Sequence, residues 1–392
     1  MVPVLCPHVA ARCSAWAPAR CANLMLRFSR GVWLWACIAV LACLSCGTPQ
    51  EKSEEPPEEP VEEEEPMRDD PVEEPMLPPV YVTVGVHIED NLRYTDCREY
   101  PRFRDGLVDF VEFVHSHGVP LRVQASYEWF IVAKQCETPD VMEATDGMSS
   151  LDYLVDRYGV AVDPHQEGAA VSDATSGNNF ADIRWAGEQV TSHMSEVTGF
   201  QWDNPRQYEQ FQAGERGLLH DYTWRPEILT GGVSVLHTDG NFSKDMTAMG
   251  VWVPSGFTEA DFLVHDEGPD ARMVYVGSGP NQWASDWGAR TNNCHYERSA
   301  DVVEAMALEI ERGTLSADGI YTYTFFIPQK VMFDPAEWSQ VTANLDQLAP
   351  LVERGQVEYK HYEDIVRIWE ERGGEPFVLD YESLDPSLRT CL

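Results

Sequence analysis

The run Val80–Ile88, which reads VYVTVGVHI, narrows the choice of fold more than any other part of the chain. It is rich in β-branched and aromatic residues and lies between Pro79 and Asn91. A short, almost wholly apolar run of this kind predicts a strand that is buried on both faces. Such strands belong to parallel sheets covered by helices, so the sequence predicts an α/β fold.

The rest of the chain continues this alternation of strands and helices. After the first strand, the pattern predicts a helix over 103–117, an extended run over 121–133, a helix over 150–158 and a strand over 160–163. The next predicted elements are less regular: a helix over 179–197 and strands near 233–237, 248–253 and 272–277. The last are a helix over 300–312, a strand over 321–327, a helix over 335–353, a strand over 357–360 and a helix over 363–372. Repeated β-α units predict a mainly parallel sheet, either open or closed as a barrel.

The first 46 residues have the pattern of a targeting segment. Residues 1–50 contain four arginines and no acidic residue, and an apolar run of 13 residues extends from Val32 to Leu44. This run is shorter than the ~20 residues that span a bilayer, and small residues and cysteines end it, as in a secretory signal. The signal pattern begins at Met25, which we interpret as the true start of the chain.

The end of this segment resembles the lipobox of bacterial lipoproteins, with Cys46 or Cys43 as the acylated residue. An ordinary cleaved signal is the alternative. Residues 47–79 follow and are rich in Glu and Pro, with 13 acidic and two basic residues between 51 and 75. Proline and like charges prevent a packed core, so this segment predicts a disordered tether. The sequence thus predicts a lipid-anchored protein of the cell envelope, at the outer membrane or cell surface.

We interpret residues 80–392 as one domain, because no second linker and no internal repeat interrupts it. The whole chain has a formal net charge of −37. Such an acidic chain is repelled by phosphate backbones, so we expect no nucleic-acid partner.

Candidate site residues follow two of the predicted strands. Glu89 and Asp90 come at the end of the first strand, while His165 and Glu167 follow the strand over 160–163. Side chains at the carboxyl ends of parallel strands gather at one edge of a sheet or one mouth of a barrel. Imidazole and carboxylate groups together are suitable ligands for a divalent metal. The alternative is that these residues are polar loop residues and helix caps.

The domain resembles the polysaccharide deacetylase superfamily, whose members have a distorted β/α barrel. The resemblance depends on 84–91, on 162–167 with 179–182 after it, and on the closing block from Phe325 to Ile365. It implies that Glu89 is the catalytic base and Asp90 a metal ligand. His165 matches the first histidine of the superfamily's metal motif, and Glu167 stands where a second histidine would lie in the shorter form of that motif.

The resemblance implies a divalent metal, with Zn²⁺ the first expectation, held by Asp90, His165 and Glu167. Two carboxylates on one cation weaken its Lewis acidity. Glu167 in place of a second histidine is therefore expected to weaken catalysis. Trp224-Arg225-Pro226 resembles the element that orients the base. His237 is the first candidate for the general acid, and His220 is the second.

Two functions remain open on these grounds. The first is a metal-dependent hydrolase that removes acyl groups from a polysaccharide or from the glycan of peptidoglycan. The second is a surface lipoprotein that keeps the barrel and binds glycan without turnover.

An even number of cysteines after the lipobox predicts disulfides in an exported chain. Because Cys97 and Cys136 follow neighbouring strands, we expect them to pair, which leaves Cys294 with Cys391; four free thiols are the alternative.

Overall fold

The computed structural model of the protein describes part of the chain. The described residues are 77–88, 96–165, 177–199, 207–230, 247–256, 261–268, 273–280, 289–290, 295–296, 298–327 and 329–390. The chain divides into the units Met1–Val72 and Glu73–Leu392, and every described residue belongs to the second. Among the described helices, none is long and apolar enough to cross a membrane.

A parallel sheet forms the first wall of the fold. Its strands are β1 (Val80–Ile88), β2 (Leu121–Ala125), β3 (Ala161–Pro164), β12 (Tyr321–Ile327) and β13 (Val357–Tyr359). The strand β1 pairs in parallel with β12 along one edge and with β13 and then β2 along the other. The strand β3 follows β2 in parallel. The predicted α/β class with a mainly parallel sheet is confirmed.

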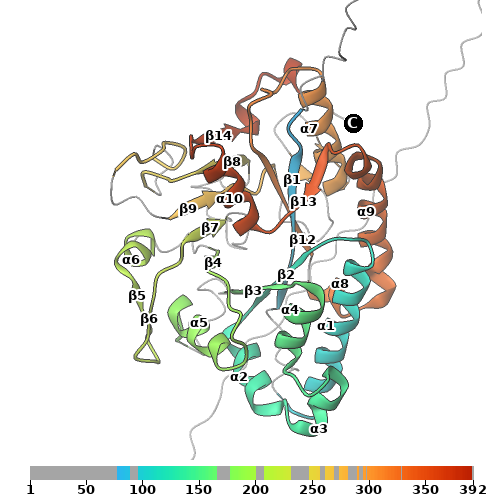
Figure 1. The fold of residues 1–392 in the computed structure, drawn as a ribbon, viewed down its shortest axis with the longest axis vertical. Coiled ribbons are helices and arrows are strands. Elements are labelled where there is room, and N and C mark those ends of the chain that lie inside the picture. Colours follow the sequence, from blue (N-terminus) through green and yellow to red (C-terminus); the bar gives the residue numbers. More distant parts are fainter. Residues whose placement is uncertain are drawn as a thin grey trace, which may run out of the picture. The chain divides into compact units, whose positions relative to one another are not determined.

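A second sheet forms the opposite wall. Its strands, in spatial order, are β14 (Phe377–Asp380), β8 (Ala248–Trp252), β9 (Val274–Val276), β7 (Ile228–Thr230) and β4 (Val197–Thr198). The strands β4, β7 and β9 are parallel, whereas β8 and β14 run antiparallel. Figure 1 shows the second sheet on the side of β1 away from the helices α1 and α9.

Backbone contacts join the two sheets into a distorted barrel. On one side, Val162 of β3 forms a parallel bridge with Met194, and the Ser195 N–H donates to the Val162 carbonyl. On the other side, the Thr324 N–H of β12 donates to the Ser278 carbonyl just beyond β9. These contacts complete a circuit of strands, so the two sheets form a closed barrel, which the strand and helix pattern alone left open.

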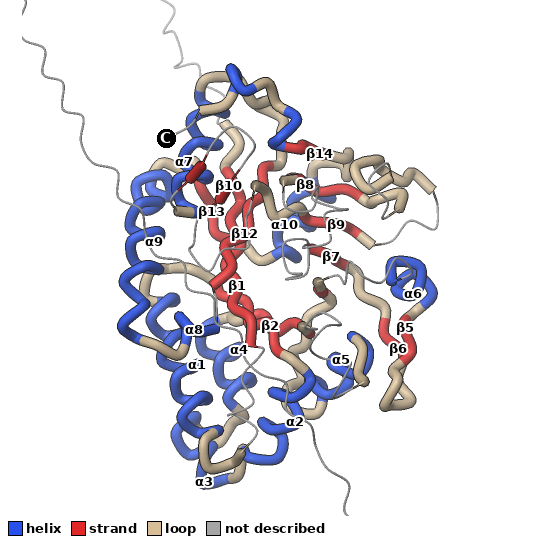
Figure 2. The backbone as a smooth tube through the Cα atoms, turned by 180° about the vertical axis from the view of Figure 1, so that it is seen from behind, coloured by secondary structure: helices blue, strands red, loops and turns tan. Residues whose placement is uncertain are grey.

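Helices cover the outer face of the first sheet, as Figure 2 shows from behind. They are α1 (Tyr100–His115), α4 (Ser150–Tyr158), α7 (Ser299–Glu311), α8 (Gln329–Met332) and α9 (Trp338–Glu353). Their apolar residues join the alternate valines of β1 in one buried cluster. The helix α10 (Tyr362–Glu371) instead packs with Tyr81 and residues of β4, β7, β8 and β9 in a second cluster.

The remaining elements connect the two walls. They are α2 (Tyr127–Cys136), α3 (Pro139–Met142), α5 (Phe180–Glu188), α6 (Gln207–Ala213), the hairpin of β5 (Glu215–Arg216) and β6 (Thr223–Trp224), and the pair β10 (Ala289–Arg290) and β11 (His295–Tyr296). Single 3-10 turns lie at Glu143–Thr145, Pro335–Glu337, Tyr381–Ser383 and Pro386–Leu388.

Two predicted elements are wrong in part. The extended run over 121–133 ends at Ala125, because the Ser126 side chain accepts a hydrogen bond from the Trp129 N–H and caps α2. The helix over 179–197 ends at Glu188. The chain beyond it turns so that Ser195 can pair with β3, which closes the barrel. The predicted strand over 233–237 lies outside the described residues.

Candidate functional site

The inner face of the first sheet is polar. Strand side chains alternate between the two faces, and the valines of β1 point to the helices. Thr83, Gly85 and His87 therefore share the opposite face. The register places Gly85 beside Arg122 and His87 beside Gln124, and Gln124 beside Asp163 of β3. A line of buried polar groups thus extends along the inside of the barrel.

His165 lies at the end of this line. It follows β3 directly, its N–H donates to the Ala125 carbonyl, and it is 1% exposed. The imidazole is therefore held where β2 and β3 end, which is the position expected of a functional residue in a parallel β/α barrel. Of the three metal ligands that the sequence predicts, the structure describes only this one.

His87 is a site residue that was not predicted from the sequence. Its ring stacks on that of His165, with the ring centroids 4.3 Å apart and the planes 27° from parallel. Phe326 of β12 packs on His87, at 5.0 Å between centroids. A buried ring clamped between two others has little freedom, so His87 can fix the orientation of the His165 ring. The signal was present in VYVTVGVHI, where a polar or small residue alternates with valine.

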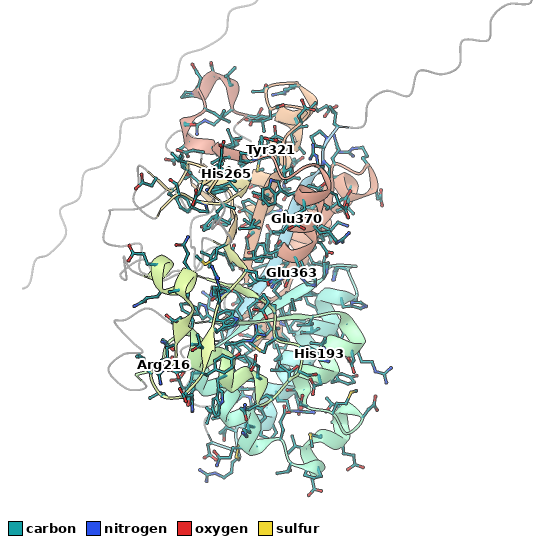
Figure 3. All side chains as sticks on the ribbon, turned by 60° about the vertical axis from the view of Figure 1, so that its left-hand side comes forward. His193, Arg216, His265, Tyr321, Glu363 and Glu370 are labelled. Carbon is teal, nitrogen blue, oxygen red and sulfur yellow. A yellow bond between two sulfur atoms is a disulfide. The ribbon has the colours of Figure 1, made fainter. Side chains whose placement is uncertain are left out.

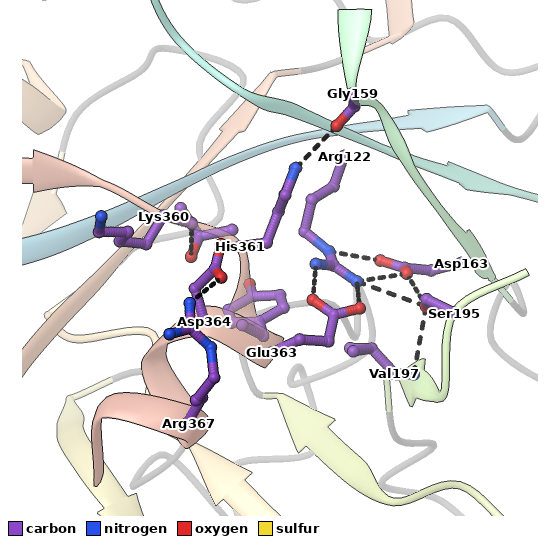
Figure 4. Close-up of polar contacts among 12 residues, drawn as sticks. Arg122, Gly159, Asp163, Ser195, Val197, Lys360, His361, Glu363, Asp364 and Arg367 are labelled. Carbon is purple, nitrogen blue, oxygen red and sulfur yellow. Dashed lines mark hydrogen bonds and ion pairs between the residues drawn. The ribbon is translucent and has the colours of Figure 1, made fainter. Parts of the chain in front are cut away.

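An ion pair with no solvent exposure lies deeper in the barrel. Arg122 donates from Nε to Asp163 Oδ2 at 2.8 Å and from Nη2 to Asp163 Oδ1 at 2.5 Å, and both side chains are 0% exposed. Ser195 Oγ also donates to Asp163, and Gln124 Nε2 donates to it at 3.3 Å. Figure 4 shows this cluster around the guanidinium group. These contacts fix β3, the strand that directly precedes His165.

Glu363 connects this ion pair with the start of α10. It accepts from Arg122 Nη1 at 2.5 Å and from Nη2 at 3.2 Å, and its own side chain is half-exposed. The Tyr362 ring lies 4.8 Å from the guanidinium carbon, and the Tyr362 hydroxyl is 2.9 Å from Thr324 Oγ1. Burial raises the pKa of Tyr362 to about 12. The strands β2, β3 and β12 and the helix α10 therefore meet at Arg122.

The charges of this cluster shift two neighbouring pKa values. Burial tends to raise the pKa of Glu363, but attraction to Arg122 and the hydrogen bonds from it lower the pKa overall. Burial and repulsion from Arg122 lower the pKa of His361, although His361 Nε2 lies 2.9 Å from the Gly159 carbonyl oxygen. His361 therefore favours the neutral form more in the folded than in the unfolded chain.

This shift gives an expected pH dependence. Below the pKa of an unfolded histidine, about 6.5, the unfolded chain binds a proton that the folded chain resists. The free energy of unfolding should therefore decrease as the pH falls below about 6.5, and Glu363 should add a second decrease below about 4.5. Urea unfolding of wild type and His361→Gln at pH 7.5 to 5 tests this, with the exposed His117→Gln as control. An equal slope in wild type and His361→Gln would contradict the assignment.

A second buried carboxylate organises the hairpin of β5 and β6. Asp182 of α5 is 0% exposed and accepts from the N–H groups of Leu218, Leu219 and His220 at 2.8 to 3.2 Å. It also forms a capping box with Asn179. Asp182 therefore has a structural role, and it holds the tip of the hairpin against the first turn of α5.

His220, the second candidate for the general acid, lies at this tip. Its ring stacks on Trp185 with centroids 3.5 Å apart, and its Nε2 lies 2.8 Å from the Tyr127 hydroxyl. Arg225 follows β6, and its side chain is exposed. Trp224 beside it is buried, and its Nε1 donates to Glu196 at 2.9 Å. The predicted residues Glu89, Asp90, Glu167 and His237 lie outside the described residues.

The disulfide between Cys97 and Cys136 is present, which confirms that prediction. It joins the segment after β1 to the end of α2. Next to it, Glu137 accepts from the Tyr100 hydroxyl at 2.8 Å and from the Ser150 N–H at 3.0 Å. The disulfide and this carboxylate together fix the chain shortly after Glu89 and Asp90. Cys294 and Cys391 lie outside the described residues.

Within the described ranges, no group of three or more His, Cys, Asp or Glu side chains is arranged to hold a metal ion. The predicted ligand set has two of its three members outside these ranges. The described part contributes the imidazole of His165, with that of His87 stacked on it.

No protein-family model matches the chain, and no curated protein matches it. Several solved structures are similar. They include a probable and a putative polysaccharide deacetylase. A probable polysaccharide deacetylase from Pseudomonas aeruginosa PAO1 has 11% identity and a TM-score of 0.42, over 74% of this chain and 91% of that one.

Two further solved structures are also similar to the chain. A putative glycoside hydrolase/deacetylase from Parabacteroides distasonis has 10% identity and a TM-score of 0.39, over 75% of this chain and 72% of that one. The 4-alpha-glucanotransferase from Thermococcus litoralis has 9% identity and a TM-score of 0.41, over 77% of this chain and 41% of that one.

Proposed function

We propose that the chain is a metal-dependent hydrolase that removes acyl groups from a cell-wall or surface polysaccharide. The observation that carries the proposal is the buried His165 at the mouth of a parallel β/α barrel, with its ring oriented by His87. The acid pair Glu89 and Asp90 directly follows Ile88 in the sequence, so it starts from the strand that carries His87.

The proposal gives each residue a role. Asp90, His165 and Glu167 would hold the divalent metal, with Zn²⁺ suited to a donor set of imidazole and carboxylates. When bound, the metal would supply Lewis acidity toward the acyl carbonyl. Glu89 would accept the proton of the attacking water, and His237 would donate a proton to the leaving nitrogen or oxygen. Arg225 would orient Glu89.

The test combines metal content with turnover. We expect protein purified without chelator to contain a divalent metal and to release acetate from an acetylated oligosaccharide. His165→Ala should remove the metal and the activity, because one of three ligands is lost, whereas the exposed His193→Ala should change neither. Full metal content in His165→Ala would show that His165 is not a ligand. Wild-type protein without metal and without acetate release would refute the hydrolase.

The second candidate is a surface lipoprotein that binds glycan without turnover. The observation that favours it is Glu167, which stands in place of a neutral histidine. Acetate release by the wild-type protein separates the two candidates, because a protein that binds glycan without turnover releases none, and Glu167→His then tests the role of Glu167. Restoring a neutral ligand should increase deacetylase activity in a weakened enzyme. Loss of activity in this variant would instead identify Glu167 as a required ligand of a different type of site.

The proposal places the protein in the cell envelope, attached through a lipid at Cys46 or Cys43 and held off the membrane by residues 47–79. Cells that express the protein should incorporate a labelled fatty-acid analogue into it. The double variant Cys43→Ala/Cys46→Ala should lose this label, while Cys6→Ala, upstream of Met25, should keep it. Equal labelling of the double variant and wild type would rule out the lipid anchor.

A further inference from the structure

The side chain of Gln124 has a buried oxygen that the described residues leave without a hydrogen-bond partner. Gln124 is 1% exposed and lies on the polar inner face of the first sheet, between His87 of β1 and Asp163 of β3. Its Nε2 donates to Asp163 Oδ2 at 3.3 Å, whereas its Oε1 accepts no hydrogen bond from any described residue. A buried acceptor without a donor costs free energy, and most such groups in proteins have a partner.

The neighbouring carboxylate decides which end of this amide is the oxygen. Asp163 is paired with the guanidinium of Arg122, and a carboxylate in such a pair only accepts hydrogen bonds. The end of the Gln124 amide that faces Asp163 is therefore the NH2 group. The oxygen is the end that is directed away from Asp163.

Gln124 lies next to the residues of the candidate site. It directly precedes Ala125, whose carbonyl accepts from the His165 N–H. Its neighbour in β1 is His87, whose ring stacks on that of His165. The unpartnered oxygen is therefore close to the imidazole that the proposed function assigns to the metal.

The ion pair of Arg122 lies deeper in the barrel than Gln124, because Arg122 comes two residues earlier in β2. In Figure 3, Glu363, which bonds to Arg122, lies between Tyr321 at the start of β12 and His193 toward the other end of the domain. Gln124 thus follows the ion pair on the side of the strand ends, where the candidate site lies.

We propose that Gln124 Oε1 accepts a hydrogen bond from the amide N–H of an N-acylated sugar, and so selects N-acyl over O-acyl groups. The inference rests on the proposed function, which brings an acyl carbonyl to a metal held by His165. An amide has an N–H next to that carbonyl, and an ester has none. With an ester bound the oxygen stays unpaired, and a site built to hydrogen-bond its substrate discriminates strongly against an analogue without the donor. The substrate class is therefore an N-acetylated glycan.

Turnover of two oligosaccharides, one N-acetylated and one O-acetylated, tests this inference. Gln124→Met retains the length of the side chain and removes its oxygen. It should lower kcat/KM for the N-acetylated substrate about tenfold more than for the O-acetylated one. The control Ser195→Ala removes another donor to Asp163 and retains the amide oxygen, so its ratio of the two kcat/KM values should equal that of wild type.

Calorimetric titration with the same two oligosaccharides separates binding from turnover. In the background of His165→Ala, Gln124→Met should weaken binding of the N-acetylated oligosaccharide about tenfold more than binding of the O-acetylated one. If binding changes in this way and wild type releases no acetate, the amide contact stands and the proposed reaction fails. If wild type releases acetate and Gln124→Met binds both oligosaccharides as its parent does, only the inference about Gln124 fails.

Two results would overturn the inference. An equal loss for both substrates would mean that Gln124 supports the fold only, and an unchanged value for the N-acetylated substrate would mean that water satisfies the oxygen. Circular dichroism checks that Gln124→Met is folded. If it is not, Gln124→Asn replaces it, because this variant retains the amide but holds the oxygen one methylene further back, and the same selective loss is expected.

Discussion

Asp163→Ala should decrease the free energy of unfolding by about 3–5 kcal/mol. The substitution leaves the guanidinium of Arg122 inside the barrel with one carboxylate instead of two, and Arg122 has no solvent exposure. The cost of a buried charge that has lost a buried partner is larger than the cost of most single substitutions. Urea unfolding at pH 7.5, followed by fluorescence and by circular dichroism, measures the change.

Two further variants separate this charge effect from a loss of packing. Arg122→Met/Asp163→Ala removes both buried charges and should be more stable than Asp163→Ala alone, because the carboxylate that then loses its partner, Glu363, is half-exposed and can be solvated. Arg157→Gln breaks an exposed ion pair with Asp146 and should change the free energy of unfolding by less than about 1 kcal/mol. If the double variant is less stable than Asp163→Ala, the loss comes from packing and the ion pair does not hold β2 to β3.

The sequence predicts the strands of the first sheet because each of them has its own local pattern. The strand Val80–Ile88 is buried along its whole length, and the closing elements from β12 to α10 begin and end within a few residues of the predicted bounds. The chain after Ser126 was predicted to be extended but is a helix. A short apolar run has no period that distinguishes a buried strand from a buried helix, so the sequence pattern alone could not decide between them. Of the second sheet, the sequence predicts β8 and β9, whereas β4, β7 and β14 were not predicted.

The contacts inside the barrel could not be predicted in this way. Arg122 bonds with Asp163, 41 positions away, and with Glu363, 241 positions away. No local pattern connects such residues, since the register of β2 and β3 and the closure of the barrel bring them together. His165 was predicted because it follows a short strand, which is a local signal. The partner that orients it, His87, comes from another strand; the alternation in β1 places it on the inner face, but its contact with His165 depends on the register of β1, β2 and β3.

Removal of the disulfide between Cys97 and Cys136 tests how the segment that carries Glu89 and Asp90 is held. Cys97→Ala/Cys136→Ala opens a loop with a sequence separation of 39 residues. Loop-closure entropy for this length corresponds to a loss of about 4 kcal/mol in the free energy of unfolding. Thermal and urea unfolding measure the loss, with wild type under reducing conditions expected to match the double variant.

The same variant connects stability with the proposed site. Ile88 and Cys97 bound the segment that contains Glu89 and Asp90, so the disulfide fixes its far end against α2. Opening the bond should lower metal affinity and acetate release more than a loss of stability alone explains. Tyr100→Phe is the control, because it removes the bond to Glu137 beside the disulfide and keeps the covalent link. If the double variant keeps wild-type metal affinity while it remains folded, the disulfide stabilises the barrel without positioning Asp90.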